Sequence, residues 1–308
     1  MKIILNHYYY MKSTIDWCEL NYIESEYIAE YWNSITGVFL IMSGILFYKF
    51  NKDLILQNDI YIKNKFKTIC NLLILVGIGT ILFHSTLLYP FQLLDEIPMI
   101  LLASEYIKIL LQLNIVQTMF KQNILQYLKI ITKYVPFLSI IISLSYFINI
   151  YLQISIFHIT LKITEISVLF ILYNLSLNLN KISYDIIYRN HNTSNKLHTS
   201  NYESLSILYN KNNMTNDYKY THLINVQNDI LEYIKIKKNI STLNNSALYY
   251  YGVSMSLWAI ENLFCNYVHF LQLHALWHIL SSIGVYKLNQ IILNYTLINN
   301  LLYKNKNV

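Results

Sequence analysis

The chain has 308 residues, of which 55% are hydrophobic and only 13% are charged, and its formal net charge is +6. Soluble domains carry about 25% charged residues, so this composition argues against a soluble protein and favours a polytopic membrane protein. The positive charge does not indicate nucleic-acid binding, because the lysines lie mostly in connecting segments. Residues 1–30 hold five carboxylates and no apolar run before a cleavage site, so we expect the first span to be an uncleaved insertion signal.

Seven segments are apolar over a length near the roughly 20 residues that a membrane helix needs. They predict an all-α integral membrane protein, a seven-transmembrane-helix bundle. The fourth and fifth spans are weakly separated, and Pro136 is expected in the first turn of the fourth, where proline is tolerated. The predicted spans are 31–50, 68–88, 94–114, 133–151, 154–178, 246–266 and 274–296.

A long polar insertion divides the predicted spans. Residues 179–245 are rich in Asn, Lys, Ser and Tyr and show no sustained apolar period. We expect a low-complexity, largely disordered segment with a short helix over 223–236. The predicted organisation is an acidic segment at 1–30, five spans within 31–178, this insertion, two spans within 246–297 and a tail at 298–308.

Lysine placement predicts the orientation of the spans. The first, third and fifth connections and the tail carry lysines, whereas the connections at 85–93, around 152 and at 267–273 carry none. By the positive-inside rule, the amino terminus is lumenal or extracellular, and the insertion and carboxyl terminus are cytosolic. The acidic segment, the end of the second span and the starts of the third and seventh spans then lie on one side of the membrane.

Three histidines in apolar segments are the leading candidates for a metal site. His274 and His278 are four residues apart, so they project from one helix face, and His84 lies one turn inside the second span at matching depth. Three imidazoles and a water form the open tetrahedral arrangement of catalytic zinc. The alternative is that each histidine bonds a neighbouring helix. The remaining histidines are weaker candidates, His158 and His269 being structural and the others lying in polar segments (His7, His191, His198 and His222).

Asp95 is the candidate general base. It follows His84 across a turn at Tyr89-Pro90, and we expect that hairpin to return it to the level of His84 in the first turn of the third span. A carboxylate there can take a proton from the attacking water and return it to the leaving group. Asp95 alternatively orients a histidine or caps the helix. Glu96 points about 100° away around the helix and is the weaker candidate.

Thr80 is a second candidate catalytic residue. It lies one turn before His84 on the same helix face, so its hydroxyl could bond the water or the developing oxyanion. A threonine inside a helix more commonly bonds back to its own backbone.

The acidic start offers oxygen ligands of the kind that calcium prefers, namely Asp16, Glu19, Asn21 and Glu30. From the residues alone, a solvated acidic segment is the favoured interpretation. Trp17 and Trp32 suit interfacial anchors equally well. Cys18 and Cys265 both fall on the predicted lumenal side, where they either form a disulfide or remain two unrelated thiols.

Taken together, these motifs resemble the alkaline ceramidases, of the superfamily that includes adiponectin-receptor-like proteins. They follow the family order over nearly the whole chain except 179–245. The motifs are Asp16-Trp17-Cys18-Glu19-x-Asn21-Tyr22, Tyr27-Ile28-Ala29-Glu30-x-Trp32-Asn33, Phe83-His84-x-Thr86-Leu87, Gln92-Leu93-Leu94-Asp95-Glu96-x-Pro98-Met99, Glu261-Asn262-x-Phe264-Cys265 and His274-Ala275-x-Trp277-His278-Ile279-Leu280.

The resemblance implies seven helices around an intramembrane zinc bound by His84, His274 and His278. It also implies a calcium site near the zinc, formed by Asp16, the Trp17 carbonyl, Glu19, Asn21 and Glu30. The implied reaction is hydrolysis of the ceramide amide to a sphingoid base and a fatty acid. Two residues depart from the family pattern, since serine is usual where Thr80 stands and aspartate is common where Glu261 stands.

The sequence therefore predicts a zinc-dependent ceramidase that acts on a membrane lipid, has no nucleic-acid partner, and lies in the endoplasmic reticulum or Golgi. A receptor-like member of the same superfamily is the first alternative. A transporter or channel whose pathway includes Lys162 is the second, but the chain has few glycines and no duplicated halves. Chain-length preference and oligomeric state do not follow from the sequence.

Overall fold

The computed structural model describes residues 12–145, 147–204 and 214–303, and these ranges contain helices but no β-strand. One isolated antiparallel bridge joins Lys12 to Leu88. The elements in chain order are α2 (Tyr31–Leu56), α3 (Ile60–Thr86), α4 (Tyr89–Gln112), α5 (Asn114–Met119), α6 (Gln122–Ser145), α7 (Ile150–Ser204), α8 (Met214–Val268), the 3₁₀ turn η1 (His269–Leu271) and α9 (Leu273–Tyr303).

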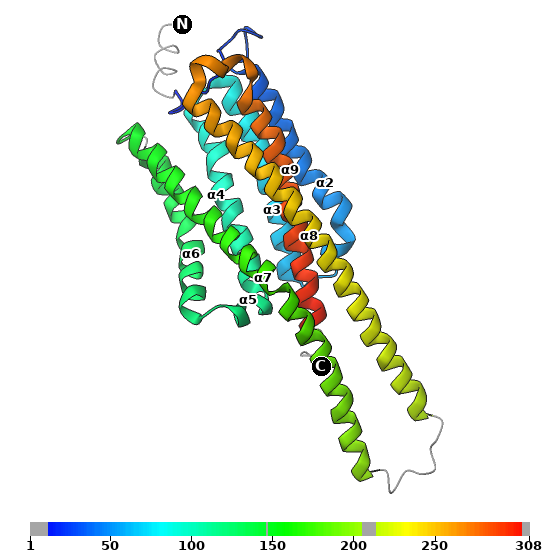
Figure 1. Cartoon of the computed structure of the whole chain (residues 1–308). Helices are drawn as coiled ribbons and strands as arrows, with labels where there is room; N and C mark the ends of the chain where they lie inside the picture. Colours follow the sequence, from blue (N-terminus) through cyan, green and yellow to red (C-terminus); the bar gives the residue numbers. More distant parts are fainter. Residues whose placement is uncertain (1–11, 146, 205–213, 304–308) are drawn as a thin grey trace.

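The long helices are packed lengthwise into an elongated bundle (Figure 1). Within the described ranges, seven helices have 24 or more residues, and each covers most of one predicted span. Four segments are long and apolar enough to cross a membrane: α2, α3, α6 and Tyr151–Leu179 within α7. The all-helical class is therefore confirmed, and the four apolar helices indicate a membrane protein.

The predicted disordered insertion differs in the structure. α7 continues to Ser204 and α8 begins at Met214, so both described parts of 179–245 are helical, including 223–236 (Figure 1). Extending an existing helix adds one hydrogen bond per residue without a new nucleation step, which favours continuation beyond the apolar part. Tyr233 and Ile240 of α8 are buried, and the Tyr233 hydroxyl donates to the carbonyl of Leu179 at 2.5 Å. The insertion thus contributes to the core.

Two local predictions about proline and the turn are corrected. The turn between α3 and α4 lies at Leu87, which has a left-handed φ of 50°, and Tyr89 and Pro90 already belong to α4. Asp95 consequently lies in the second turn of α4 rather than the first. Pro136 lies inside α6, because that helix begins earlier than expected, at Gln122. A proline there removes one helical hydrogen bond.

Glycines allow neighbouring helices to approach closely near the histidine end of the bundle. An added Cβ at Gly77 of α3 would lie 2.7 Å from the carbonyl oxygen of Gly37 in α2. At Gly79 it would collide with the backbone of Leu94 and Asp95 in α4. Small residues at such contacts are typical of membrane helix packing. Gly79 therefore sets the distance between Thr80, the next residue, and Asp95.

The segment before α2 is attached to the end of α3 by backbone hydrogen bonds. Ala29 N–H donates to Ser85 O at 3.0 Å, and Glu30 N–H donates to His84 O at 2.9 Å. A disulfide joins Cys18 to Cys265 near the end of α8, while Cys70 is a free buried thiol. These links hold the acidic segment over the end of the bundle that contains His84.

Candidate metal centre

Three histidines from two helices meet in the interior. His84 comes from the last turn of α3, and His274 and His278 come from successive turns at the start of α9. Their exposed fractions are 0%, 2% and 1%. One ring nitrogen from each lies within 4.8 Å of the others. Among the described residues, these three histidines are the group of His, Cys, Asp or Glu side chains placed closely enough to hold a metal ion together.

Each ring has an oxygen close to its Nδ1 atom, and in two of the three the contact is a hydrogen bond. His84 Nδ1 lies 2.5 Å from Glu30 Oε2, and His278 Nδ1 lies 3.0 Å from Thr36 Oγ1. The Thr36 hydroxyl lies within hydrogen-bond distance of the carbonyls of Trp32 and Asn33, to which it can donate, so its oxygen is free to accept from His278. These contacts place the proton on Nδ1 and leave Nε2 as a lone-pair donor.

The third ring has a carboxylate at the same position. His274 Nδ1 lies 3.2 Å from Glu261 Oε2, within ion-pair distance but without hydrogen-bond alignment. Trp17 stacks on this ring with 3.9 Å between centroids. The acidic segment therefore contributes the aromatic wall of the cluster as well as Glu30.

The donor set fits a zinc ion. His84 Nε2 is buried and has no hydrogen-bond partner, although a buried polar nitrogen normally has one. Three imidazoles, two of which have the other ring nitrogen at hydrogen-bond distance from an oxygen, are a typical zinc environment. The three residues could hold a metal ion and leave room in its coordination for water or substrate.

Asp95 and Thr80 lie beside each other on facing helices. Thr80 Oγ1 donates to Asp95 Oδ1 at 2.7 Å and also lies 2.9 Å from the carbonyl of Val76 in its own helix. The hydroxyl thus contacts both the carboxylate and the backbone, so the two alternatives for Thr80 are not exclusive. Asp95, Thr80 and His278 line one cavity.

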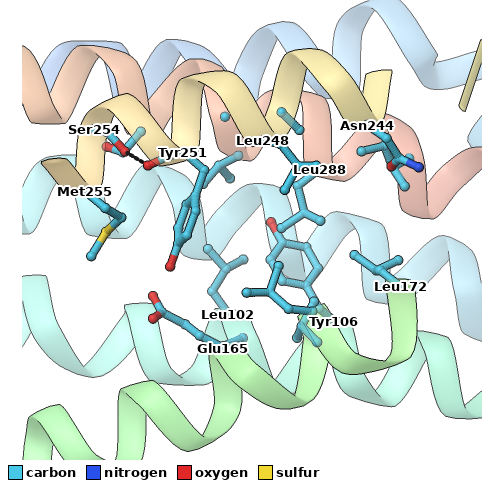
Figure 2. Close-up of a pocket in the computed structure, with 18 of the residues that line it drawn as sticks. Leu102, Tyr106, Glu165, Leu172, Asn244, Leu248, Tyr251, Ser254, Met255 and Leu288 are labelled. Atoms are coloured by element: carbon cyan, nitrogen blue, oxygen red, sulfur yellow. Dashed lines mark hydrogen bonds between the residues drawn. The ribbon is translucent and has the colours of Figure 1, made fainter. Parts of the chain in front are cut away.

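That cavity has a volume of about 800 Å³ and extends along α9 from Trp277 to Ile291. It is formed mainly by apolar side chains of α3, α4, α7, α8 and α9, several of which are labelled in Figure 2 (Leu102, Leu172, Leu248 and Leu288). An apolar cavity with a few convergent polar groups is the usual form of a small-molecule site. This one suits a hydrocarbon chain whose polar group lies near His278.

Glu96 has a role that sequence reasoning missed. It is buried, and its two oxygens accept hydrogen bonds from Gln92 Nε2 at 2.7 Å and Gln153 Nε2 at 3.0 Å. Gln92 also contacts Thr14 of the amino-terminal segment through both its amide atoms. The network joins that segment, α4 and α7 next to Asp95. Gln92 and Glu96 are four residues apart, so on a helix their side chains are neighbours, and this spacing could have indicated their hydrogen bond.

The acidic segment is not simply solvated. Glu19 and Glu30 are 5% and 0% exposed, whereas Glu24 and Glu26 are exposed. Glu19 accepts from the N–H groups of Trp32 and Asn33 at 2.7 and 2.9 Å, so it satisfies free donors at the start of α2. Burial raises the pKa of the Glu19 carboxyl above its ordinary value, and these two donors oppose that rise.

The residues predicted to bind calcium come together only in part. Asn21 Nδ2 lies 3.1 Å from Asp16 Oδ1, and Glu30 Oε1 accepts from Trp17 N–H at 3.0 Å. Asn21 Oδ1 is buried without a hydrogen-bond partner, which favours a nearby cation. Asp16, in contrast, lies 3.6 Å from the ammonium of Lys12. The orphaned oxygen is the feature that fits a calcium ion.

A family model described as ceramidase matches residues 9–307 of the chain. The chain belongs to the ceramidase family. It is 46% identical over 89 residues to the alkaline ceramidase YPC1 of Saccharomyces cerevisiae, which is 29% of this chain and 26% of that protein. It is 31% identical over 150 residues to the putative alkaline ceramidase dcd3B of Dictyostelium discoideum, 44% of this chain and 50% of that protein.

Human alkaline ceramidase 1 is similar over a longer stretch, with 22% identity over 277 residues, 89% of this chain and 79% of that protein. The first two ceramidase relatives are matched over a quarter and a half of their own lengths. Family membership is thus shown for nearly the whole chain.

Proposed function

We propose that the protein hydrolyses the amide bond of ceramide, giving a sphingoid base and a fatty acid, at a zinc ion held by His84, His274 and His278. The observation that carries the proposal is the buried triad of imidazoles, each with Nδ1 near an oxygen, one of which, His278, lines the same apolar cavity as Asp95. The match to the ceramidase family supports the choice of substrate.

Each group at the site has a separate role in the proposed reaction. When bound, zinc supplies Lewis-acid polarisation of the carbonyl and lowers the pKa of a water. Asp95 accepts a proton from the attacking water and returns it to the nitrogen of the departing sphingoid base. Thr80 holds the Asp95 carboxylate through its 2.7 Å hydrogen bond. Glu30, Thr36 and Glu261 keep the three rings in place.

Calcium is proposed as a second, structural ion. Asp16, the Trp17 carbonyl, Glu19, Asn21 and Glu30 would hold it, and its support is the buried free oxygen of Asn21. Glu30 would belong to both metal sites, because its other oxygen faces His84. A calcium ion there would stabilise the acidic segment against the end of α2 and α3.

We further propose that all seven long helices cross the membrane, with the amino terminus lumenal and the carboxyl terminus cytosolic, in the endoplasmic reticulum or Golgi. Ceramide would enter sideways from the bilayer. Leu169 and Tyr173 of α7 and Leu248 of α8 line the cavity and are also exposed, which supports an opening between these helices, in the half of the membrane nearer the cytosol under this topology.

The test is direct incubation of the purified full-length chain with a panel of ceramides, with and without a chelator. We expect release of fatty acid that the chelator stops and that added zinc restores. Hydrolysis that persists unchanged after the metal has been removed would contradict the proposal, as would a protein that hydrolyses no ceramide in the presence of zinc.

A further inference from the structure

An acidic side chain lies in the apolar part of the cavity, away from the histidines. Asp95 and Glu165 are the acidic residues in the cavity lining that the structure describes, and Glu165 comes from the apolar section of α7. A carboxylate within a membrane-spanning segment is costly and usually marks a site for a ligand or an ion. The proposed hydrolysis gives Glu165 no task.

Glu165 has polar neighbours on two sides. Lys162, one turn earlier in α7, donates Nζ to Glu165 Oε2 at 3.1 Å. From α8, the hydroxyl of Tyr251 points toward the same carboxylate, with Leu102 close by (Figure 2). Tyr251 also lines the cavity. An acceptor and a phenol from facing helices therefore meet at one level of the cavity wall, which also carries polar side chains such as Asn244 and Ser254.

The position of this pair relative to the metal centre follows from α9. The Tyr251 backbone nitrogen lies opposite Gly284, at 3.8 Å from a Cβ added there. Gly284 is six residues after His278, which corresponds to about 9 Å along the helix axis. A hydrocarbon chain that runs from His278 into the cavity thus passes Glu165 and Tyr251 well beyond its first carbons.

A methylene group is a poor neighbour for this pair. It offers no hydrogen bond to the carboxylate or to the phenol, although Lys162 still donates to Glu165. A hydroxyl can donate to Glu165 and accept from Tyr251 at once. Sites built to bond a hydroxyl reject ligands that lack it far more strongly than apolar pockets reject an extra group.

We infer that Glu165 and Tyr251 form a subsite for a hydroxyl in the middle of the substrate's hydrocarbon chain. The favoured substrates are then long-chain lipid amides with a mid-chain hydroxyl, on whichever chain enters the cavity. This inference rests on the proposed function for the placement of the amide at His278.

The experiment compares ceramides that differ only in one hydroxyl. The probes are sphinganine with an octadecanoyl chain, the same lipid hydroxylated in mid-chain on the acyl group or on the base, and the same lipid hydroxylated beside the carbonyl. We expect one mid-chain probe to exceed the unsubstituted lipid by about tenfold or more in kcat/KM. The probe hydroxylated beside the carbonyl should show no such gain. Equal rates for all four probes would overturn the inference.

Variants identify the residues responsible. Tyr251→Phe removes only a hydroxyl and should abolish the preference for a mid-chain hydroxyl. Glu165→Leu should also abolish the preference. If Glu165→Leu does not fold, the result for Tyr251→Phe alone tests the subsite. Tyr173→Phe is the matched control, since Tyr173 also lines the cavity two turns further along α7. Full preference in Tyr251→Phe would refute the subsite.

A binding measurement separates this inference from the proposed function. If wild-type protein hydrolyses no ceramide, the hydrolase proposal fails, but the subsite can still be tested by thermal unfolding with free fatty acids. Mid-chain hydroxyoctadecanoic acid should raise the unfolding temperature more than octadecanoic acid in the wild type and equally in Tyr251→Phe. The same response to both acids in the wild type would then refute the subsite.

Discussion

The histidine cluster and the acidic segment lie at the same end of the bundle, and both bury polar groups, yet they are held in opposite ways. In the cluster, oxygens face the Nδ1 atoms, and the Nε2 atom of His84 has no protein partner. In the acidic segment, both oxygens of Glu19 accept from backbone N–H groups of α2. The first pattern leaves a donor for a ligand, whereas the second satisfies the fold.

The difference shows how a binding site can be distinguished from a structural polar group. Burial alone does not separate the two, because Glu30 and His84 are equally buried. The informative feature is an atom that remains without a partner after its neighbours have been satisfied. Asn21 Oδ1 has that feature within the acidic segment, which is why Asn21 supports the calcium proposal better than Glu19 does.

The largest expected effect comes from breaking the cluster itself. His278→Ala removes one of three zinc ligands, so we expect loss of bound zinc and of ceramide hydrolysis. His158→Ala is the control, because His158 is only half-buried and lies near Trp258 rather than in the cluster. Fatty-acid release and zinc content of both purified variants check this. Retention of activity in His278→Ala would remove the basis for the assignment.

Asp95→Asn should separate catalysis from metal binding. The amide keeps the shape of the side chain but cannot accept the proton, so kcat should fall by about 10²- to 10⁴-fold. Zinc content should stay as in the wild type, because Asp95 is not among the ligands. Steady-state kinetics and elemental analysis on the same preparation provide the measurement. A variant that lost its zinc would show that Asp95 supports the site and not the proton transfer.

Glu261→Gln tests whether the contact at His274 Nδ1 matters. Loss of the carboxylate should weaken zinc binding by about 10- to 100-fold, as is usual for residues that orient a ligand. Competition with a graded series of chelators measures the affinity. Glu24→Gln, at an exposed position of the acidic segment, should leave it unchanged. If Glu261→Gln bound zinc as tightly as the wild type, the 3.2 Å contact would be incidental.

Gly79→Ala should disturb the packing that brings Asp95 to Thr80. The added methyl collides with backbone in α4, so we expect a loss of about 1–3 kcal/mol in stability together with a lower kcat. Gly252→Ala is the matched control, since an added Cβ there meets no atom within 4 Å. Thermal unfolding in detergent, followed by kinetics, compares the two. Equal behaviour of both variants would show that α3 and α4 can separate without consequence.

The smallest effect is expected in the acidic segment. Glu19→Gln keeps one acceptor for the α2 amides and loses the other, which should cost about 1–2 kcal/mol of stability. Zinc affinity should not change. If calcium binds as proposed, added calcium should raise the unfolding temperature of the wild type more than that of the variant. A calcium response of the same size in both would exclude Glu19 as a ligand.

Several parts of the fold could be predicted from the sequence. The apolar spans located the seven long helices, because a bilayer-length apolar run has few alternatives to a helix. The four-residue spacing of His274 and His278 placed both rings on one face, and His84, predicted at matching depth, lies with them in the structure. Of the two alternatives for Cys18 and Cys265, the structure has the disulfide.

Other parts depended on contacts that composition does not reveal. The helical form of the 179–245 insertion, as far as it is described, follows from continuation of α7 and α8 and from burial of residues such as Tyr233 and Ile240. Glu96 and Glu19 differ little from surface carboxylates in the sequence. Their burial is explained by contacts with Gln153, which is 57 residues from Glu96, and with backbone amides of α2, which are 13 and 14 residues from Glu19. Pro136 was misplaced because the polar first turns of α6 were not counted as helix.

The central claim is that His84, His274 and His278 hold one catalytic zinc ion, and elemental analysis of the active protein tests it most directly. Purified wild-type protein that hydrolyses ceramide should contain one zinc ion per chain, and its activity should fall in proportion as the zinc is withdrawn and return as it is restored. A preparation that contains no zinc and still hydrolyses ceramide at the full rate would contradict the account.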